Sequence, residues 1–323
     1  METDYLERFE RGDILAAARI MSIVERGGSD AEALITRLFS KVGRAYRIGV
    51  TGLTGSGKST LVNELTQRFR QRGSTVGVVA EDPTSPFSGG AILGDRVRMR
   101  DSAGDEGVFI RSIASRGNET GLSATATEIA DVLDAFGRDV VFLETIGIGQ
   151  LEYKIRYSGH TTIVVLTPDA GDDVQGMKSG LMEIGDVFVV NKSDRKHAER
   201  YANDLRSILE LTSGERDWVP RVVGTVAVKG EGIDELMESI DAHRAFLGEG
   251  DRLEEQRVES LRNRVVMVVD EKMKDLFWQN DAVKAKLEGM LSEVVAGKKS
   301  PYQAAHELLS IEYLSNATKG DSQ

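Results

Sequence analysis

The sequence contains no cysteine, and this absence excludes several kinds of chemistry at once. Without thiols the chain can form no disulfide bond, no zinc knuckle and no thiolate nucleophile. A chain without cysteine is compatible with any compartment, a reducing cytosol included, and we expect a cytoplasmic protein. Histidine is also scarce, and the four residues are scattered without a metal-ligand spacing, so we interpret them as structural or surface residues. They are His160, His197, His243 and His306.

The sequence also lacks an excess of positive charge and a long apolar run. It has 41 Lys and Arg residues and 52 Asp and Glu residues, which gives a formal net charge of −11 at pH 7. Scattered basic residues in an acidic chain leave no electrostatic footprint for nucleic acid or an anionic membrane. No apolar run approaches the length of a membrane span, and the acidic first residues do not resemble a signal peptide. We therefore expect neither nucleic acid nor a membrane as a partner.

Three regions differ in the pattern of their apolar residues. Residues 1–44 are expected to form a helical extension, because apolar residues from Leu6 to Met21 recur every three or four positions. Gly27 and Gly28 are expected to end this first helix, and a second short helix follows. Residues 247–323 are helical again and are expected to pack on the surface or on a second subunit, with helices at 253–269 and 283–295.

The middle region, residues 45–246, predicts an α/β domain. Short apolar runs alternate there with amphipathic stretches of ten or more residues, which is typical of βαβ units. We expect a mostly parallel sheet flanked by helices, with ligands beyond the carboxyl ends of the strands. The expected strands are Arg47–Thr51, Thr75–Ala80, Val108–Ile110, Val140–Glu144, Thr161–Thr167, Val187–Asn191 and Val222–Val226.

A phosphate loop follows the first of these strands and leads into a helix. Its string Gly-Leu-Thr-Gly-Ser-Gly-Lys-Ser matches G-x-x-x-x-G-K-S in the strand–loop–helix context that the motif requires. The glycines let successive N–H groups point into one concavity, and the helix N-terminus favours anions. Lys58 can reach the β- and γ-phosphates, and the Ser59 hydroxyl can bind Mg²⁺. The predicted nucleotide-binding residues are Gly52, Leu53, Thr54, Gly55, Ser56, Gly57, Lys58, Ser59 and Thr60.

A base-reading motif, Asn-Lys-Ser-Asp, follows the strand that ends near Val190. Asp194 can accept both the N1–H and the 2-amine of guanine, whereas adenine would leave its carboxylate unpaired. That cost of about 1–3 kcal/mol selects GTP over ATP by about tenfold or more. We predict that Asn191 supports the other edge of the base and that the Lys192 stem lies over the ring. A loop with Val226, Ala227 and Val228 fits a backbone contact to the base, and a plain strand-to-helix turn is its competing interpretation.

Carboxylates near the ends of the predicted strands suggest a magnesium site. Mg²⁺ prefers oxygen ligands, keeps several waters and uses one or two carboxylates together with phosphates. The candidate residues are Asp82, Asp95 and Glu144, beside the Ser59 hydroxyl. For Asp82 and Asp95 a helix cap or a turn is the competing interpretation, whereas a carboxylate that ends an apolar strand, as Glu144 does, is unusual.

An Asp-rich loop follows the strand expected at 161–167. In this loop, Gln175 could orient a water molecule and Lys178 could offset the charge that develops on the phosphoryl group. A solvated turn explains the same residues equally well on chemical grounds alone.

These motifs together resemble the methylmalonyl-CoA mutase-associated GTPases, of the MeaB and ArgK type, which are also described as arginine/ornithine transport ATPases. The resemblance spans nearly the whole chain, from the helical start to Gly297 and the Ser-Pro at 300–301. Its specific strings are Gly-Gly-Ala-Ile-Leu-Gly-Asp at 89–95 and Glu-Thr-Ile-Gly-Ile-Gly-Gln at 144–150.

The resemblance implies a homodimeric, slow GTPase that serves as a chaperone for an adenosylcobalamin-dependent acyl-CoA mutase. Such proteins gate the delivery of intact cofactor to the mutase and help to expel damaged cofactor. By matching position, Ser59, Asp82, Asp95 and Glu144 resemble the family's Mg²⁺ and switch residues. Asp172, Gln175 and Lys178 resemble a switch loop that becomes catalytic, with Lys58, when the mutase orders it. The arm at 247–323 is similar to the family's dimerisation element.

Three positions depart from the family pattern. Thr54 stands where the family often has proline, Leu151 replaces a serine, and the segment with Thr120 lacks the usual double glycine. A mutase that acts on a different acyl-CoA would explain such departures.

Three other functions fit parts of the sequence. A nickel-insertion GTPase would need cysteine or histidine clusters, which are missing. An ATP-using kinase or transport-coupled ATPase is opposed by Asp194. A regulatory module that holds nucleotide without hydrolysing it shares the same motifs.

Overall fold

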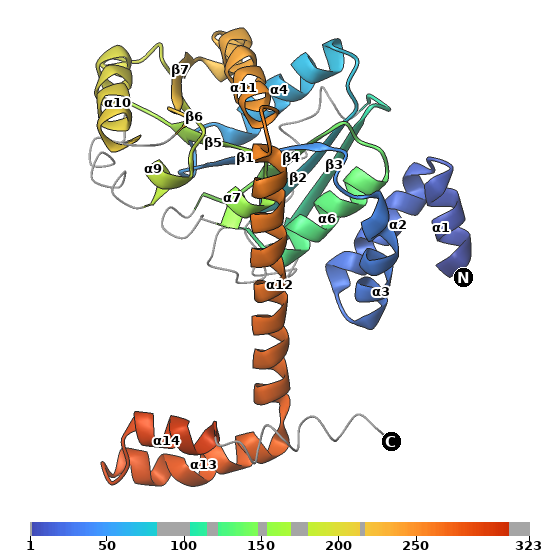
Figure 1. The fold of residues 1–323 in the computed structure, drawn as a ribbon, viewed down its shortest axis with the longest axis vertical. Helices are drawn as coiled ribbons and strands as arrows, with labels where there is room; N and C mark the ends of the chain where they lie inside the picture. The colour runs from blue at the N-terminus through green and yellow to red at the C-terminus, as the bar shows by residue number, and fades with distance from the viewer. Residues whose placement is uncertain are drawn as a thin grey trace. The chain divides into compact units, whose positions relative to one another are not determined.

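The structure, a computed structural model, describes residues 2–82, 104–114, 122–147, 154–168, 180–213 and 217–309. The chain divides into two compact units, Met1–Arg257 and Val258–Gln323. The first unit contains a seven-stranded sheet in the order β3-β2-β4-β1-β5-β6-β7 (Figure 1), and every neighbouring pair is parallel. The predicted α/β fold is therefore confirmed. The strands are β1 (Tyr46–Gly52), β2 (Val76–Asp82), β3 (Val108–Ala114), β4 (Val140–Glu144), β5 (Thr161–Leu166), β6 (Val187–Asn191) and β7 (Arg221–Thr225).

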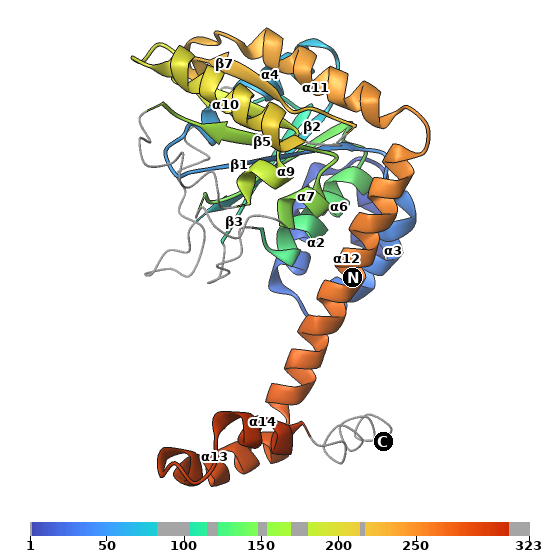
Figure 2. The same cartoon turned by 60° about the vertical axis from the view of Figure 1, so that its left-hand side comes forward.

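Both faces of the sheet are covered, which explains the continuous apolar runs of its strands. Phe142 of β4 packs on the face that α4 (Lys58–Gln71) and α11 (Ile233–Leu247) cover. Its neighbour Leu143 packs on the opposite face with α6 (Ala124–Ala135). Figure 2 shows α4 and α11 on one side of the sheet and α6 on the other. The opposite face also carries α7 (Lys154–Ser158), α9 (Leu181–Ile184) and α10 (Ala198–Ser213).

The N-terminal extension contains three helices rather than the two expected. The prediction of one continuous first helix is wrong, because α1 (Glu2–Glu10) ends before Gly12, whose φ is +83°, and α2 (Ile14–Arg26) begins after Asp13. The Asp13 carboxylate accepts hydrogen bonds from the N–H groups of Leu15 and Ala16 and so caps α2. The apolar spacing continues across this break and conceals it. The extension continues with α3 (Ser29–Leu38) and the short 3₁₀ helix η1 (Phe39–Lys41).

A buried ion-pair cluster fixes the start of β1 against α6. The Arg47 guanidinium lies 2.8 Å from carboxylate oxygens of both Asp131 and Asp134. Asp134 also accepts hydrogen bonds from the N–H groups of Gly43, Arg44 and Ala45. Because these buried charges satisfy one another, the segment that leads into β1 is held in a single position.

Two of the histidines are structural residues of this domain. Burial lowers the pKa of His160 to about 4, and its Nδ1 accepts a hydrogen bond from the Arg47 N–H. Burial also lowers the pKa of His243 to about 4, and its Nδ1 lies 2.8 Å from the Thr161 hydroxyl. Both rings are therefore neutral near pH 7 and serve packing and hydrogen bonding.

The C-terminal part of the chain is helical, as expected. The structure places α12 at Arg252–Gln279, α13 at Asp281–Val295 and α14 at Pro301–Leu308. The Asn280 side chain caps α13, and Ser300 caps α14 in a capping box with Gln303. Within Val258–Gln323 a small core of Val283, Met290, Ala304 and Leu308 joins α13 to α14.

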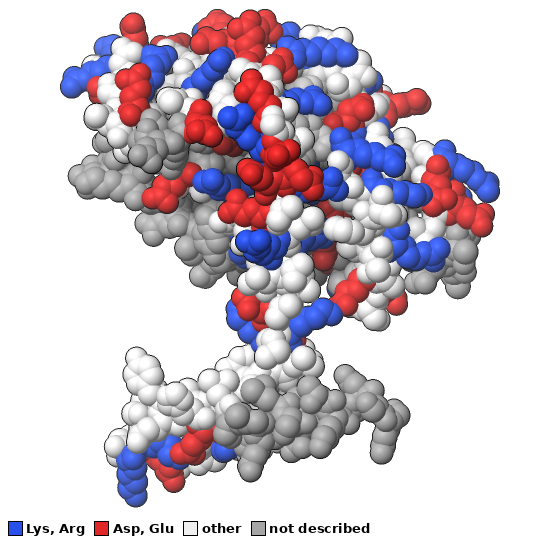
Figure 3. Space-filling model, viewed as in Figure 1, with Lys and Arg blue, Asp and Glu red and all other residues white. Residues whose placement is uncertain are grey.

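The surface charges agree with the charge balance of the sequence. On the face shown in Figure 3, Lys and Arg are interspersed with Asp and Glu over the described residues, without an extended basic field. None of the helices in the described ranges combines the length and the apolarity that crossing a bilayer requires.

Candidate nucleotide site

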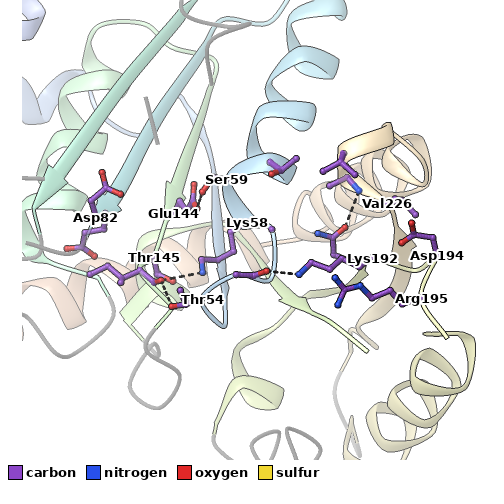
Figure 4. Close-up of a pocket in the computed structure, with 18 residues that line it drawn as sticks. Thr54, Lys58, Ser59, Asp82, Glu144, Thr145, Lys192, Asp194, Arg195 and Val226 are labelled. Carbon is purple, nitrogen blue, oxygen red and sulfur yellow. Dashed lines mark hydrogen bonds between the residues drawn. The ribbon is translucent and has the colours of Figure 1, made fainter. Parts of the chain in front are cut away.

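A cavity of about 630 Å³ opens at the carboxyl ends of the central strands. This volume lies within the range of about 300–1,000 Å³ that is usual for small-molecule sites. Figure 4 shows Asp82, Glu144 and Ser59 at one end of the site and Asp194 at the other, with Lys58 and Lys192 between them. The lining residues are Thr54, Gly55, Gly57, Lys58, Ser59, Thr60, Glu81, Asp82, Glu144, Thr145, Ile146, Asn191, Lys192, Asp194, Arg195, Val226, Ala227 and Val228.

The phosphate loop joins β1 to α4 in the manner that its sequence predicts, and two of its glycines are sterically required. Gly52 has a φ of +136°, and a Cβ atom there would lie 2.1 Å from the Val165 carbonyl oxygen. Gly57 has a φ of +99°, and its Cβ would lie 2.2 Å from the Asn191 amide nitrogen. Any side chain at either position would push the loop away from its neighbours.

Lys58 holds its ammonium group inside this loop. The side chain is largely buried, and its Nζ donates to the carbonyl oxygens of Gly52 at 2.8 Å and Leu53 at 3.2 Å. A third carbonyl, that of Ile146, lies 3.4 Å away. The loop carbonyls thus place one positive charge at the N-terminus of α4, where the unpaired N–H groups of the helix also favour anions.

Oxygen atoms suited to Mg²⁺ gather beside Lys58. The Ser59 hydroxyl donates to the Glu144 carboxylate at 2.7 Å, and both side chains are buried. Asp82, the last residue of β2, is also buried and lines the same cavity. The described residues contain no group of three or more His, Asp or Glu side chains close enough to hold a metal by themselves. This donor set fits Mg²⁺, which uses one or two carboxylates and completes its shell with phosphates and waters.

Asn191 links the phosphate loop to the loop that follows β7. Its amide nitrogen donates to the Ser56 carbonyl at 2.8 Å. Its amide oxygen accepts from the Thr225 hydroxyl and from the Ala227 N–H, both at 3.1 Å. These three hydrogen bonds give Asn191 a bridging role between the two halves of the cavity, in addition to the contact with the base that the sequence predicts.

The other residues of the base-reading motif lie at the far end of the cavity. Lys192 has a φ of +60°, and its Nζ donates to the Gly55 carbonyl at 2.9 Å. Asp194 is about half exposed, and one of its carboxylate oxygens lies 3.4 Å from the Lys229 ammonium. The predicted residues Val226, Ala227 and Val228 line this end as well. A purine placed here would therefore meet a carboxylate acceptor.

Four lining residues were not predicted from the sequence: Glu81, Thr145, Ile146 and Arg195. Glu81, Thr145 and Arg195 are immediate neighbours of the predicted residues Asp82, Glu144 and Asp194, and Ile146 lies two positions after Glu144, so proximity to these residues is the signal that could have found all four. The Glu81 carboxylate accepts from the Ser123 N–H at 3.0 Å, and the Thr145 hydroxyl donates to that of Thr51 at 3.1 Å.

Several predicted residues lie outside the described ranges. They are Asp95 of the proposed metal site, Asp172, Gln175 and Lys178 of the proposed switch loop, and the family departures Thr120 and Leu151.

Comparison with known families gives one match over most of the chain. The family "Methylmalonyl Co-A mutase-associated GTPase MeaB" matches residues 17–282. This range includes the whole sheet, both halves of the cavity and all of α12.

Individual relatives agree with this match. A Pyrococcus abyssi protein named as a GTPase is 44% identical over 272 residues, which cover 83% of this chain and 84% of the relative. The GTPase ArgK of Escherichia coli is 36% identical and covers 80% of this chain, with 82% of its own length matched. Among solved structures, an LAO/AO transport system kinase superposes with a TM-score of 0.74 at 26% identity and covers 97% of both chains.

Proposed function

This chain belongs to the methylmalonyl-CoA mutase-associated GTPase family and is a P-loop GTPase, and on that premise we propose that it serves an adenosylcobalamin-dependent acyl-CoA mutase as a chaperone. In this role GTP binding and hydrolysis gate the loading of cofactor and protect or reactivate the mutase. The observation that carries the proposal is the family match over residues 17–282, which includes a complete candidate guanine-nucleotide cavity.

The cavity supports GTP with Mg²⁺ as the bound species. Residues 52–60 would surround the phosphates, with Lys58 against the β- and γ-phosphates. Asp194 would accept the N1–H and 2-amine of guanine at the opposite end. Ser59, Glu144 and Asp82 would hold Mg²⁺ beside the phosphates, with Asp95 as a further candidate, and the ion would neutralise charge on the phosphate oxygens when bound.

Hydrolysis requires an ordered water and a way to offset the charge on the phosphoryl group. The described residues supply Lys58 for the second task. We assign the first to Gln175 and further charge compensation to Lys178, both in the loop that also contains Asp172. A loop that the mutase must order would keep hydrolysis slow until the partner binds.

The Lys178→Ala variant tests the partner step of this proposal. We expect it to bind GDP nearly as wild type does, because Lys178 lies in the switch loop and outside the phosphate loop. We also expect the mutase to accelerate GTP hydrolysis by the wild type and to leave the variant unaccelerated. Rates of phosphate release with and without mutase measure this. If stimulation survives the substitution, the switch assignment is wrong, and if wild type shows none, the chaperone role itself fails.

A second candidate function is an ATP-using kinase or transport-coupled ATPase, because the solved relative is named as a transport system kinase. The Asp194 carboxylate at the base end of the cavity argues against it. Calorimetric titration with GDP and with ADP separates the two functions. Clearly tighter GDP binding supports the GTPase, and equal affinities would favour the alternative.

We also propose that the chain forms a homodimer through its C-terminal arm. Although α12 is 28 residues long, it contains no buried residue. Five of its exposed apolar residues recur at spacings of seven, four, four and three positions, so they share one face of the helix. A stripe of this kind is costly in water, and a second copy of the arm would cover it. The residues are Val258, Val265, Val269, Met273 and Leu276.

Replacing Val269 by glutamate is expected to convert the dimer to monomers. The substitution places a charge in the middle of the apolar stripe, where dimerisation would have to desolvate it. Sedimentation velocity measures the change in mass. The Glu271→Gln variant alters an exposed charge two positions further along α12, off the stripe, and should leave the mass unchanged. A monomeric wild type, or a Val269→Glu variant that remains dimeric, would remove this proposal.

A further inference from the structure

We propose that Thr54 is a positioning residue that holds the segment 145–147 against the phosphate loop and so favours a bound diphosphate over a triphosphate. The inference rests on the proposed use of this cavity for guanine nucleotides. It adds a specific side chain to that function.

Thr54 makes a direct connection between the two segments. Its hydroxyl donates to the Gly147 carbonyl at 3.0 Å, and the Ile146 carbonyl lies 3.4 Å from the same oxygen. Thr54 belongs to the loop after β1, whereas Ile146 and Gly147 follow β4, so this contact spans more than ninety positions in the sequence. The contact is partly exposed, and water competes for it.

Gly147 fits closely against the same loop. It has a φ of +90°, and a Cβ atom there would lie 2.4 Å from the Lys58 Nζ, 2.5 Å from the Gly52 carbonyl oxygen and 2.9 Å from the Thr54 nitrogen. The Ile146 carbonyl also lies 3.4 Å from the Lys58 ammonium. The segment 145–147 therefore contacts the Lys58 ammonium, the group that would bind the terminal phosphates of a nucleotide.

A third phosphate and the segment 145–147 compete for the space around Lys58. A third phosphate must be placed beside this ammonium, and the Ile146 and Gly147 backbone must move away to admit it. A diphosphate extends less far and requires less displacement. Since the Thr54 hydroxyl bonds the segment in its near position, breaking that bond is part of the cost of binding a triphosphate but not of binding a diphosphate. A ligand shifts such an equilibrium only through this difference between the two states.

The Thr54→Val variant tests the inference because valine keeps the branched shape and removes the donor. We expect the ratio of affinities, non-hydrolysable GTP analogue over GDP, to rise by about twofold to tenfold, which is the worth of one partly exposed hydrogen bond. Calorimetric titrations with both nucleotides in the presence of Mg²⁺ give the ratio. Thr54→Ser retains the hydroxyl and is expected to restore the wild-type ratio.

The possible outcomes separate this inference from the function on which it rests. If the wild type binds neither nucleotide, the proposed nucleotide site fails. If the wild type binds both and Thr54→Val leaves the ratio unchanged or lowers it, the positioning role of Thr54 is overturned while the site stands. If valine and serine raise the ratio equally, the hydroxyl is not the cause, and the inference is again overturned.

Discussion

Replacing Asp194 by asparagine is expected to move the base preference of this protein from guanine to xanthine. The carboxylate offers two acceptors to the N1–H and 2-amine of guanine. An asparagine has only one acceptor, and its N–H₂ donor would face one of these two donors of guanine. Losing a hydrogen bond to a charged group costs about 1.5–3 kcal/mol, so GDP affinity should fall by about tenfold to a hundredfold. Xanthine carries an oxygen in place of the 2-amine, and the asparagine N–H₂ can donate to it.

Calorimetric titration of wild type and Asp194→Asn with GDP and with XDP measures this exchange. The variant should gain XDP affinity while it loses GDP affinity, a reversal that general damage to the fold would not produce. Asp204→Asn is a matched control, because this exposed carboxylate on α10 lies outside the lining of the cavity. An Asp194→Asn variant with unchanged GDP affinity would show that this carboxylate does not read the base.

Replacing Lys58 by alanine is expected to abolish high-affinity nucleotide binding. The ammonium is the one charge that the Gly52 and Leu53 carbonyls hold inside the phosphate loop, at the N-terminus of α4. Its loss removes a charged hydrogen bond to the β-phosphate and, in GTP, another to the γ-phosphate, each worth about tenfold to a hundredfold in affinity. Titration with GDP and with a GTP analogue should show the loss for both nucleotides.

Because Lys58 also bonds loop carbonyls, the thermal unfolding of the variant must be measured beside its binding. A folded variant that fails to bind supports the assignment. Lys196→Ala removes an exposed lysine that does not line the cavity and should bind as wild type does. Wild-type affinity in Lys58→Ala would show that the phosphates bind elsewhere.

Local patterns predicted much of the fold because neighbouring residues determine them. The strand before Gly52 and the helix after it follow from apolar runs and from the phosphate-loop string, and the structure confirms both. Local patterns failed to predict a helix boundary where the apolar spacing of one helix continues into the next. The apolar spacing from Leu6 to Met21 continues through Gly12 and Asp13, and it conceals the end of α1 and the cap of α2.

Strand ends were also less predictable than strand centres. The sequence suggested that β3 ends near Ile110, but the strand continues to Ala114 because it pairs with β2 along that strand's whole length, as far as Asp82. The partly polar string Arg-Ser at 111–112 gives no local sign of this pairing. A neighbouring strand, rather than the propensity of those residues, decides where β3 ends.

The sequence by itself determined the two strings that predict a phosphate loop and a guanine-reading motif, because each is a short string whose residues act through their own backbone and side-chain chemistry. Only the tertiary structure decided how the two are joined. Asn191 reaches Ser56 and Ala227, and Ser59 reaches Glu144, over separations of 135, 36 and 85 positions. Hydrogen bonds of this kind depend on the strand order of the sheet, which brings the carboxyl ends of β1, β4, β6 and β7 to one edge, and no local pattern encodes that order.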